Sequence, residues 1–271
     1  MRDSNPRRTL SLQQPLIIAH RGASSVAPEN TMAAFERALA DGADGIEFDV
    51  RLAGDGVPVV IHDAELRRVG RRPGNVSSLT SAELGECEVG SWFNHRFPAL
   101  AQKSYASERV PTLKQLFRFI AGSEARLYLE MKAGKGDGSS LPLEVSKLIR
   151  DHSLEARVVV LSFDLTSIRD LKMIDSNIRT GALFQPGLFR IGASVRKTRM
   201  VRAAMEVEAN QIALHRLLVS PRIVRQARDE GLDVVVWTVD QPAWVETARQ
   251  LGVQALITNN PRAMRSGADS L

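Results

Sequence analysis

Short apolar runs recur along the chain and alternate with longer segments that have a helical pattern. The runs are rich in Val, Ile and Leu and lack the polar alternation of half-exposed strands, which is typical of parallel strands buried on both faces. They lie at Leu16–Ala19, Gly45–Val50, Val57–Ile61, Leu127–Met131, Val158–Leu161, Thr180–Phe184, Gln211–Leu214, Asp233–Val239 and Ala255–Thr258.

The segments between these runs predict helices at residues 31–41, 111–121 and 221–230, each with apolar side chains on one face. The last begins at Pro221 and stops before Gly231, the usual asymmetry of a helix.

One connection is too short to hold a helix. Between Val50 and Val57 the Gly54-Asp55-Gly56 turn predicts a hairpin, which lays His62 beside Asp49. Without this return strand, eight parallel strands remain among the runs. Eight is the number that closes an α/β (β/α)8 TIM barrel. We therefore expect one domain over residues 15–271, preceded by a flexible tail over residues 1–14.

Residues 63–109 interrupt the alternation with Gly, Pro and aromatic residues and one short helix-like stretch near 79–87. Long excursions at the catalytic face of a barrel are usually functional. Two interpretations remain open: an insertion subdomain or lid that shapes a substrate site, or a surface decoration packed by its own aromatics.

Composition narrows the possible partners. The net charge of +5 favours anionic ligands, but the densest basic cluster lacks interleaved aromatics, so we expect no nucleic acid. A single cysteine, Cys87, excludes an internal disulfide. No apolar signal segment and no run of about 20 apolar residues occurs, so we expect no transmembrane segment and a cytoplasmic location.

Three acids at predicted strand ends are the first candidates for a chemical site. Glu47 and Asp49 lie two residues apart on one predicted strand and face the same side, and Glu130 ends a later strand. Inward acids among apolar neighbours are costly without a partner, and a hard divalent cation supplies one. The alternative is surface charge. Oxygen ligands favour Mg²⁺ or Ca²⁺, with Mn²⁺ possible, over zinc.

Two histidines also stand at predicted strand ends. His20 precedes an Arg and His62 precedes an Asp, and such a pair can act as general base and acid at neutral pH. A structural role is the alternative for each, and we take His215, which no motif surrounds, as structural.

Three further side chains suit a substrate that carries a phosphate group. Arg21 and Lys132 can bind phosphate, although Lys132 could instead form a simple ion pair with Glu130. Trp237 either packs in the core or forms a wall for the alcohol part of a substrate.

The sequences of these fragments and their order along the chain resemble those of the glycerophosphodiester phosphodiesterase family. The resemblance rests on AHRGASSVAPENT followed by GIEFDV and VVIHD, then on VPTLKQLF, LYLEMK, LSFD, VVVWTVD and ALITNNP, and it covers roughly residues 16–262. It implies a barrel with a small insertion after the His-Asp element, and Mg²⁺ or Ca²⁺ as cofactor. It also implies Glu47, Asp49 and Glu130 as metal ligands, His20 and His62 as the acid/base pair, and Arg21, Lys132 and Trp237 as substrate-binding residues.

The chain departs from the family pattern at a few positions. Asp240 stands where the family commonly has Asn, Asn259 where it commonly has Asp, and Arg67 where an acid is usual. None of these is a proposed metal ligand or proton-transfer group, so they bear on substrate preference.

We therefore expect metal-dependent hydrolysis of a glycerophosphodiester to glycerol 3-phosphate and an alcohol. Water, or the neighbouring glycerol hydroxyl by way of a cyclic phosphate, would be the nucleophile. The alternatives are a lysophospholipase D, with Leu188-Phe189 and Trp92-Phe93 admitting an acyl chain, and a non-catalytic phosphodiester-binding barrel.

Overall fold

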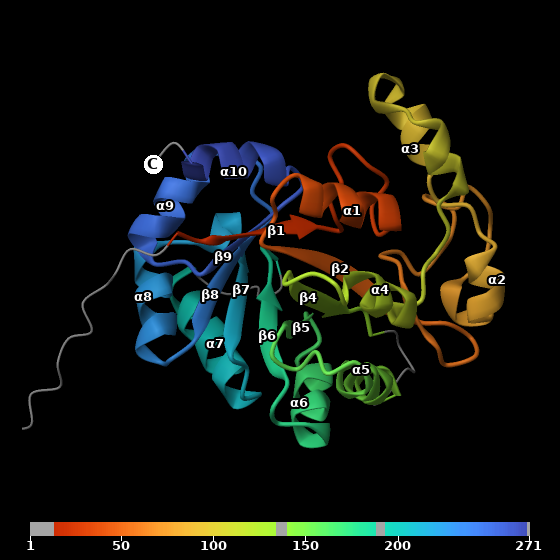
Figure 1. The fold of residues 1–271 in the computed structure, drawn as a ribbon. Helices are drawn as coiled ribbons and strands as arrows, with labels where there is room; N and C mark the ends of the chain where they lie inside the picture. Colours follow the sequence, from red (N-terminus) through yellow and green to blue (C-terminus); the bar gives the residue numbers. More distant parts are fainter. Residues whose placement is uncertain (1–13, 134–139, 188–192, 270–271) are drawn as a thin grey trace, which may run out of the picture.

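A closed barrel of eight parallel strands forms the centre of the computed structural model, which describes residues 14–133, 140–187 and 193–269 (Figure 1). Closure comes from the first strand, which pairs with β2 on one side and with β9 on the other. The predicted TIM barrel is thereby confirmed. Its strands are β1 (Leu16–His20), β2 (Gly45–Leu52), β4 (Arg126–Met131), β5 (Val158–Ser162), β6 (Arg179–Phe184), β7 (Gln211–His215), β8 (Asp233–Trp237) and β9 (Ala255–Thr258).

The predicted hairpin is also present. Strand β3 (Pro58–Val60) runs antiparallel to β2, with Val50 opposite Val60. Strand β3 pairs with the C-terminal part of β2, beyond the residues of β2 that pair with β1. The backbone N–H of Ile61 then donates to the carbonyl of Asp49 (2.9 Å), so His62 arrives beside the acidic part of β2.

Helices cover the outside of the barrel. They are α1 (Met32–Ala40), α4 (Leu113–Ile120), α5 (Ser140–Asp151), α6 (Leu165–Ile174), α7 (Ala193–Glu206), α8 (Pro221–Asp229), α9 (Ala243–Leu251) and α10 (Pro261–Asp269), with the short 3₁₀ helix η4 (Arg216–Leu218) after β7. Hydroxyl groups of Thr31, Thr112 and Ser220 cap the first turns of α1, α4 and α8.

Successive side chains of a barrel strand point alternately outward, toward the helices, and inward, toward the barrel interior. On β2, Ile46, Phe48 and Val50 point outward into the apolar layer beneath the helices. Glu47 and Asp49 have the opposite parity and face the barrel interior. Nearer the start of the strands that interior is filled by apolar side chains such as Ile18. The acids therefore lie toward the C-terminal ends, where barrels of this kind carry their sites.

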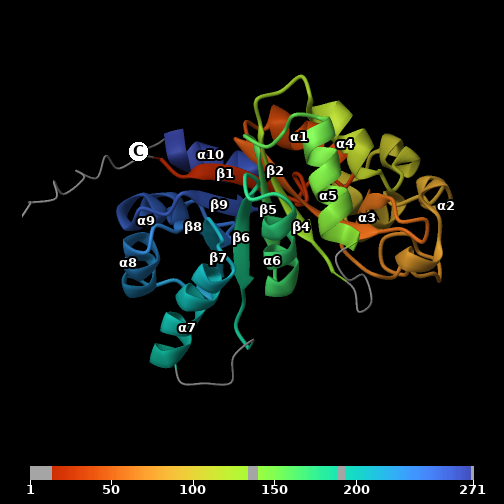
Figure 2. The ribbon, with the colours of Figure 1, turned by 90° about the horizontal axis from the view of Figure 1, so that it is seen from below.

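The insertion between β3 and α4 lies to one side of the barrel, beyond α1 and α4 (Figures 1 and 2). It contains α2 (Ser81–Gly85), α3 (Ser91–Arg96) and the 3₁₀ helices η1 (Val76–Ser78), η2 (Pro98–Leu100) and η3 (Lys103–Ser107). Phe93 is fully buried and contacts the rings of Trp92, Phe97 and Tyr105. The Tyr105 hydroxyl donates to the carbonyl of Val26 (3.1 Å), which ties the insertion to the loop after β1.

Some expectations differ from the structure or fall outside it. Strand β8 ends at Trp237, two residues earlier than predicted, although the backbone N–H of Val239 still donates to the carbonyl of Ile257 (3.0 Å). Leu188-Phe189 and residues 1–13 of the expected tail lie outside the described residues. In the part of the chain that the structure describes, no helix has both the length and the apolar character to cross a membrane.

Candidate active site

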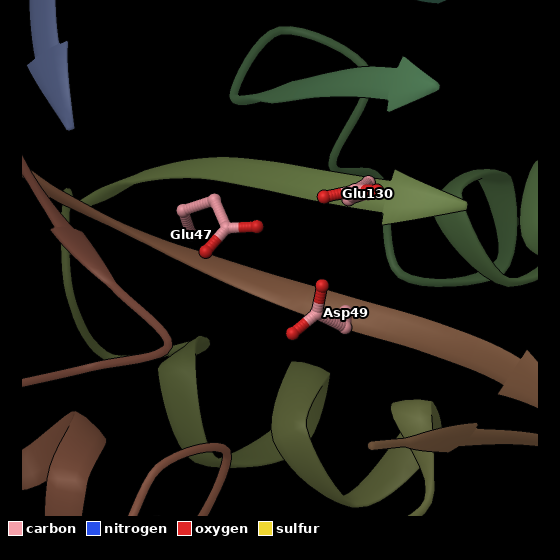
Figure 3. Close-up of side chains that lie close together, drawn as sticks. All are labelled: Glu47, Asp49 and Glu130. Atoms are coloured by element: carbon pink, nitrogen blue, oxygen red, sulfur yellow. The ribbon is translucent and has the colours of Figure 1, made fainter. Parts of the chain in front are cut away.

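Three buried carboxylates meet at the mouth of the barrel (Figure 3). Glu47 and Asp49 come from β2 and Glu130 comes from the adjacent β4, where it is the register partner of Asp49. Each offers one oxygen atom, and these atoms lie within 4.8 Å of one another. The strand alternation and the parallel register thus bring together the three acids that the sequence singled out.

Two cations partly neutralise this cluster. The Lys132 ammonium lies 2.6 Å from Glu130 Oε1 and 3.1 Å from Asp49 Oδ1. The Nε of Arg21 lies 3.2 Å from Asp49 Oδ2. The ion pair that was the alternative role for Lys132 is therefore present, but Lys132 also contacts a second acid.

The pKa values of the acids reflect this arrangement. Burial, and after it the charge of Asp49, raises the pKa of Glu130 to about 7. Burial and the charges of Asp49 and Glu130 hold the pKa of Glu47 well above its usual range. Burial acts the same way on Asp49, but Lys132 and Arg21 overcome it and hold its pKa well below normal.

These residues fit a divalent cation. Three oxygen donors converge in a buried place. Burial, together with a negative charge that exceeds that of the two nearby cations, raises the pKa of two of the three acids. A hard cation at their centre would remove that conflict, because it favours the ionised form of every ligand.

The two histidines flank the acids with different partners. His20, at the end of β1, points its Nε2 at Glu47, with Oε2 at 3.9 Å. Burial and the adjacent Arg21 lower the pKa of His20 to about 4. His62 follows β3, and its Nδ1 donates to Asp63 Oδ1 (2.7 Å). Burial lowers the pKa of His62, while Asp49 and Asp63 act to raise it.

A chain of hydrogen bonds fixes the ring of His20. Its Nδ1 lies 2.7 Å from Asn259 Oδ1. The Asn259 amide group donates to Asp240 Oδ2 (2.8 Å), and the hydroxyl of Ser24 donates to Asn259 Oδ1 (3.0 Å). Since a carboxylate only accepts, the amide oxygen must face His20, whose Nδ1 therefore carries the proton. Asp240 and Asn259, two departures from the pattern the chain resembles, thus touch each other.

Arg21 is held by a second network. Its Nη1 donates to Glu29 (2.8 Å), and Glu29 also accepts two bonds from Arg68 (both 2.7 Å). Arg21 adopts a φ of +57°, and Gly22 follows with a φ of +80°. A Cβ at Gly22 would lie 2.6 Å from the backbone of Ala34, so the turn after β1 requires glycine there.

Trp237 lies apart from the carboxylates, on another part of the mouth. Its indole N–H donates to the carbonyl of Ala213 (3.2 Å), and its ring stands edge-on to Phe163 and to His215. The Lys132 ammonium lies over the Phe163 ring at 5.9 Å. His215, expected to be structural, supports Trp237 and accepts from the N–H of Leu217 (3.3 Å).

Several residues of the site had no assigned role from the sequence. Asn30 is buried and donates to Asp49 Oδ2 (2.8 Å), which orients that carboxylate. Glu29 and Arg68 hold Arg21, as described above. Glu29 and Asn30 belong to the Pro-Glu-Asn-Thr motif, so the sequence offered a way to find them. Arg68 lies in the insertion, outside any motif, so the sequence offered none.

Comparison with known proteins agrees with the geometry. The model of the glycerophosphoryl diester phosphodiesterase family matches residues 20–263. The glycerophosphodiester phosphodiesterase of Caldanaerobacter subterraneus subsp. tengcongensis is 34% identical over 249 residues, which are 92% of this chain and 96% of that protein. The enzyme of the same name from Bacillus subtilis is 31% identical over 262 residues, 93% of this chain and 86% of that protein.

Solved structures share the fold. A glycerophosphodiester phosphodiesterase from Agrobacterium tumefaciens is 27% identical with a TM-score of 0.76, covering 93% of this chain and 99% of that chain. An Oleispira antarctica phosphodiesterase, solved in complex with the product sn-glycerol-3-phosphate, is 24% identical with a TM-score of 0.81 and covers 94% of this chain and 97% of that chain.

Proposed function

The chain belongs to the glycerophosphoryl diester phosphodiesterase family, and from this premise we propose how its barrel mouth hydrolyses a glycerophosphodiester to glycerol 3-phosphate and an alcohol. It is a phosphoric diester hydrolase. The observation that carries the proposal is the buried cluster of Glu47, Asp49 and Glu130 flanked by two histidines.

Glu47, Asp49 and Glu130 would hold a divalent cation, Mg²⁺ or Ca²⁺ with Mn²⁺ as a substitute. The bound cation would neutralise the phosphate oxygens and the charge that develops on them in the transition state. Asn30 supports this role, since its amide fixes one oxygen of Asp49 and leaves the other facing Glu130 and Lys132.

His20 is the general base in this scheme. Its Nδ1 proton is engaged by Asn259, and its low pKa keeps the ring neutral at physiological pH, so Nε2 is free to accept a proton. That proton comes from water or from the neighbouring glycerol hydroxyl, whose oxygen forms the new bond to phosphorus. Accumulation of a cyclic phosphate in ³¹P NMR would separate the second route from the first.

His62 is the general acid. Burial lowers the pKa of His62, but its Nδ1 donates to the Asp63 carboxylate, which opposes that effect and favours the imidazolium form that can give up a proton. Its other ring nitrogen delivers a proton to the leaving alcohol oxygen as the phosphorus–oxygen bond breaks. On the direct route, exchange with solvent then returns both rings to their starting protonation. On the cyclic route, water attacks the phosphorus, His62 takes a proton from it, and His20 returns one to the glycerol oxygen as the ring opens to glycerol 3-phosphate.

Arg21, Lys132 and Trp237 would bind the substrate. The two cations face the carboxylates from different sides, so a phosphate docking there would meet positive charge on both. Trp237 and Phe163 would form an apolar wall for the glycerol part. We also propose that residues 15–271 act as one catalytic domain, in which the insertion at 63–109 shapes the substrate site.

The test is product release from a simple diester. Glycerophosphoglycerol is incubated with the protein, and glycerol 3-phosphate is measured with a coupled dehydrogenase. We expect turnover that chelation abolishes and Mg²⁺ restores, a large loss in Glu130→Gln and none in the surface control Glu246→Gln. Full turnover after exhaustive chelation would contradict the metal role. Release of lysophosphatidic acid from lysophosphatidylcholine at a higher rate would favour a lysophospholipase D, and binding without product would favour a non-catalytic barrel.

A further inference from the structure

An open cleft of about 870 Å³ joins the barrel mouth to the insertion. His20 and Arg21 line it from the barrel, while Arg71, His95 and Arg96 line it from the insertion. Its volume lies in the range of sites that hold a whole small molecule, well beyond the needs of one phosphate group. Trp237 and Lys132 are not among its lining residues, so the cleft extends away from the proposed glycerol wall.

We propose that this cleft binds the leaving alcohol and selects one that carries its own anionic group, such as a polyol phosphate. The inference rests on the proposed function, because it assigns a place to the alcohol that the reaction releases. It goes beyond that function by naming the class of head group.

The acids that line the cleft are already engaged. Glu29 accepts from both Arg21 and Arg68 at 2.7–2.8 Å. Asp240 accepts from the Thr258 hydroxyl and from both the backbone and the side-chain N–H groups of Asn259, at 2.7–2.9 Å. Neither carboxylate has an oxygen without a donor to offer a cationic head group.

Two arginines of the insertion have no such partner. Among the described residues, neither Arg71 nor Arg96 forms an ion pair with a carboxylate, and both are exposed. Arg71 Nη1 lies 3.1 Å and 3.3 Å from the two ring nitrogens of His95, whose Nδ1 is in turn 2.6 Å from the carbonyl of Ser91. Arg96 lies 5.8 Å over the ring of Phe97. Neither guanidinium group is thus held by a carboxylate of the described residues that would neutralise its charge.

The aromatic rings of the cleft do not favour a quaternary ammonium group. Trp92 and Phe97 could hold one by cation–π contact. However, Arg68 already lies 5.6 Å over the Trp92 ring and Arg96 lies over the Phe97 ring. A choline group would have to displace a guanidinium and would meet the positive charge of Arg71.

A pair of substrates that differ by one phosphate tests the proposal. Steady-state kcat/KM is measured for glycerophosphoinositol and glycerophosphoinositol 4-phosphate, with glycerophosphocholine as the cationic comparison. We expect the phosphorylated substrate to be preferred at least about tenfold, mainly through KM, and the preference to shrink at high salt. The Arg71→Gln/Arg96→Gln variant should lose the preference, because its kcat/KM falls much more for the phosphorylated substrate than for glycerophosphoinositol. Arg225→Gln, on distant helix α8, removes one charge and should keep it.

Each contrary result is specific. Equal kcat/KM for the two inositol substrates in the wild type, or an unchanged preference in the double variant, would overturn the proposal, as would an equal loss on both substrates. Dissociation constants of the two diesters for His62→Ala, measured by calorimetry, test the cleft independently of turnover. A tenfold difference there without wild-type turnover would support the cleft and refute the proposed activity, while equal constants would refute the cleft.

Discussion

Replacement of Lys132 by Met tests the charge balance at the barrel mouth. The Lys132 side chain is only 14% exposed and its ammonium contacts Glu130 and Asp49 at 2.6 and 3.1 Å. Removing one partner of a buried ion pair costs about 3–5 kcal/mol. In a chain of this size each kcal/mol lowers Tm by about 2–4 °C, so we expect a loss of about 6–20 °C.

The size of that loss depends on pH. Glu130 has a folded pKa raised from 4.5 to about 7, so its contribution to stability is fully present below pH 4.5 and is lost as pH rises through 7. Without Lys132 the pKa of Glu130 rises further. At pH 6 Glu130 is then protonated, so no buried negative charge is left unpaired there. The deficit of the Lys132→Met variant should therefore be smaller at pH 6 than at pH 8.

A divalent cation should compensate for the missing ammonium. A ligand at 100 times its Kd stabilises the folded state by about 2.7 kcal/mol, and the gain is larger for a form that binds more tightly. Scanning calorimetry with and without Mg²⁺ should show a greater Tm rise in Lys132→Met than in the wild type. Lys114→Met, on the exposed face of α4, is the matched control and should shift stability by less than about 0.5 kcal/mol. If Lys132→Met melts like Lys114→Met, or if Mg²⁺ raises its Tm no more than in the wild type, the assigned charge balance is wrong.

Three further outcomes are expected. His20→Ala and His62→Ala should each keep the fold by circular dichroism and lower kcat by about 10²–10⁴-fold, and near-normal turnover would make that histidine structural. Because Glu130 has a pKa of about 7 and Glu47 has a raised pKa, and both must lose a proton to bind a cation, Mg²⁺ affinity by calorimetry should rise by at least about tenfold from pH 6 to pH 8, and a flat profile would argue against Glu130 as a ligand. Phe93→Ala should lower the urea-unfolding free energy by about 3–5 kcal/mol, because Phe93 is fully buried among aromatic rings, and a loss below about 1 kcal/mol would show that this cluster is dispensable.

The parts of the site that were predictable depend on local pattern. Alternation placed Glu47 and Asp49 on one face, and the same rule placed Lys132 with Glu130. The short connection after Val50 predicted the hairpin that brings in His62. In a parallel barrel the C-terminal ends of all strands lie at the same mouth. The residues at those ends could therefore be placed together without knowing how the intervening segments fold.

The remaining features depend on contacts between distant loops. The orientation of His20 depends on Asn259, 239 residues away, and that amide is oriented by Asp240. Arg68 reaches Glu29 across 39 residues from an insertion without regular pattern. Such hydrogen bonds leave no periodic trace in a sequence. The end of β8 at Trp237 was likewise hidden, because the apolar run continues to Val239 while the strand does not.

The central claim is that Glu47, Asp49 and Glu130 hold the catalytic cation. Crystals of the protein soaked in Mn²⁺ and measured at the manganese absorption edge test it most directly. The account predicts an anomalous peak among the three carboxylates, in contact with an oxygen of each. A peak only at other positions, or a Glu130 side chain turned away from the ion, would contradict it.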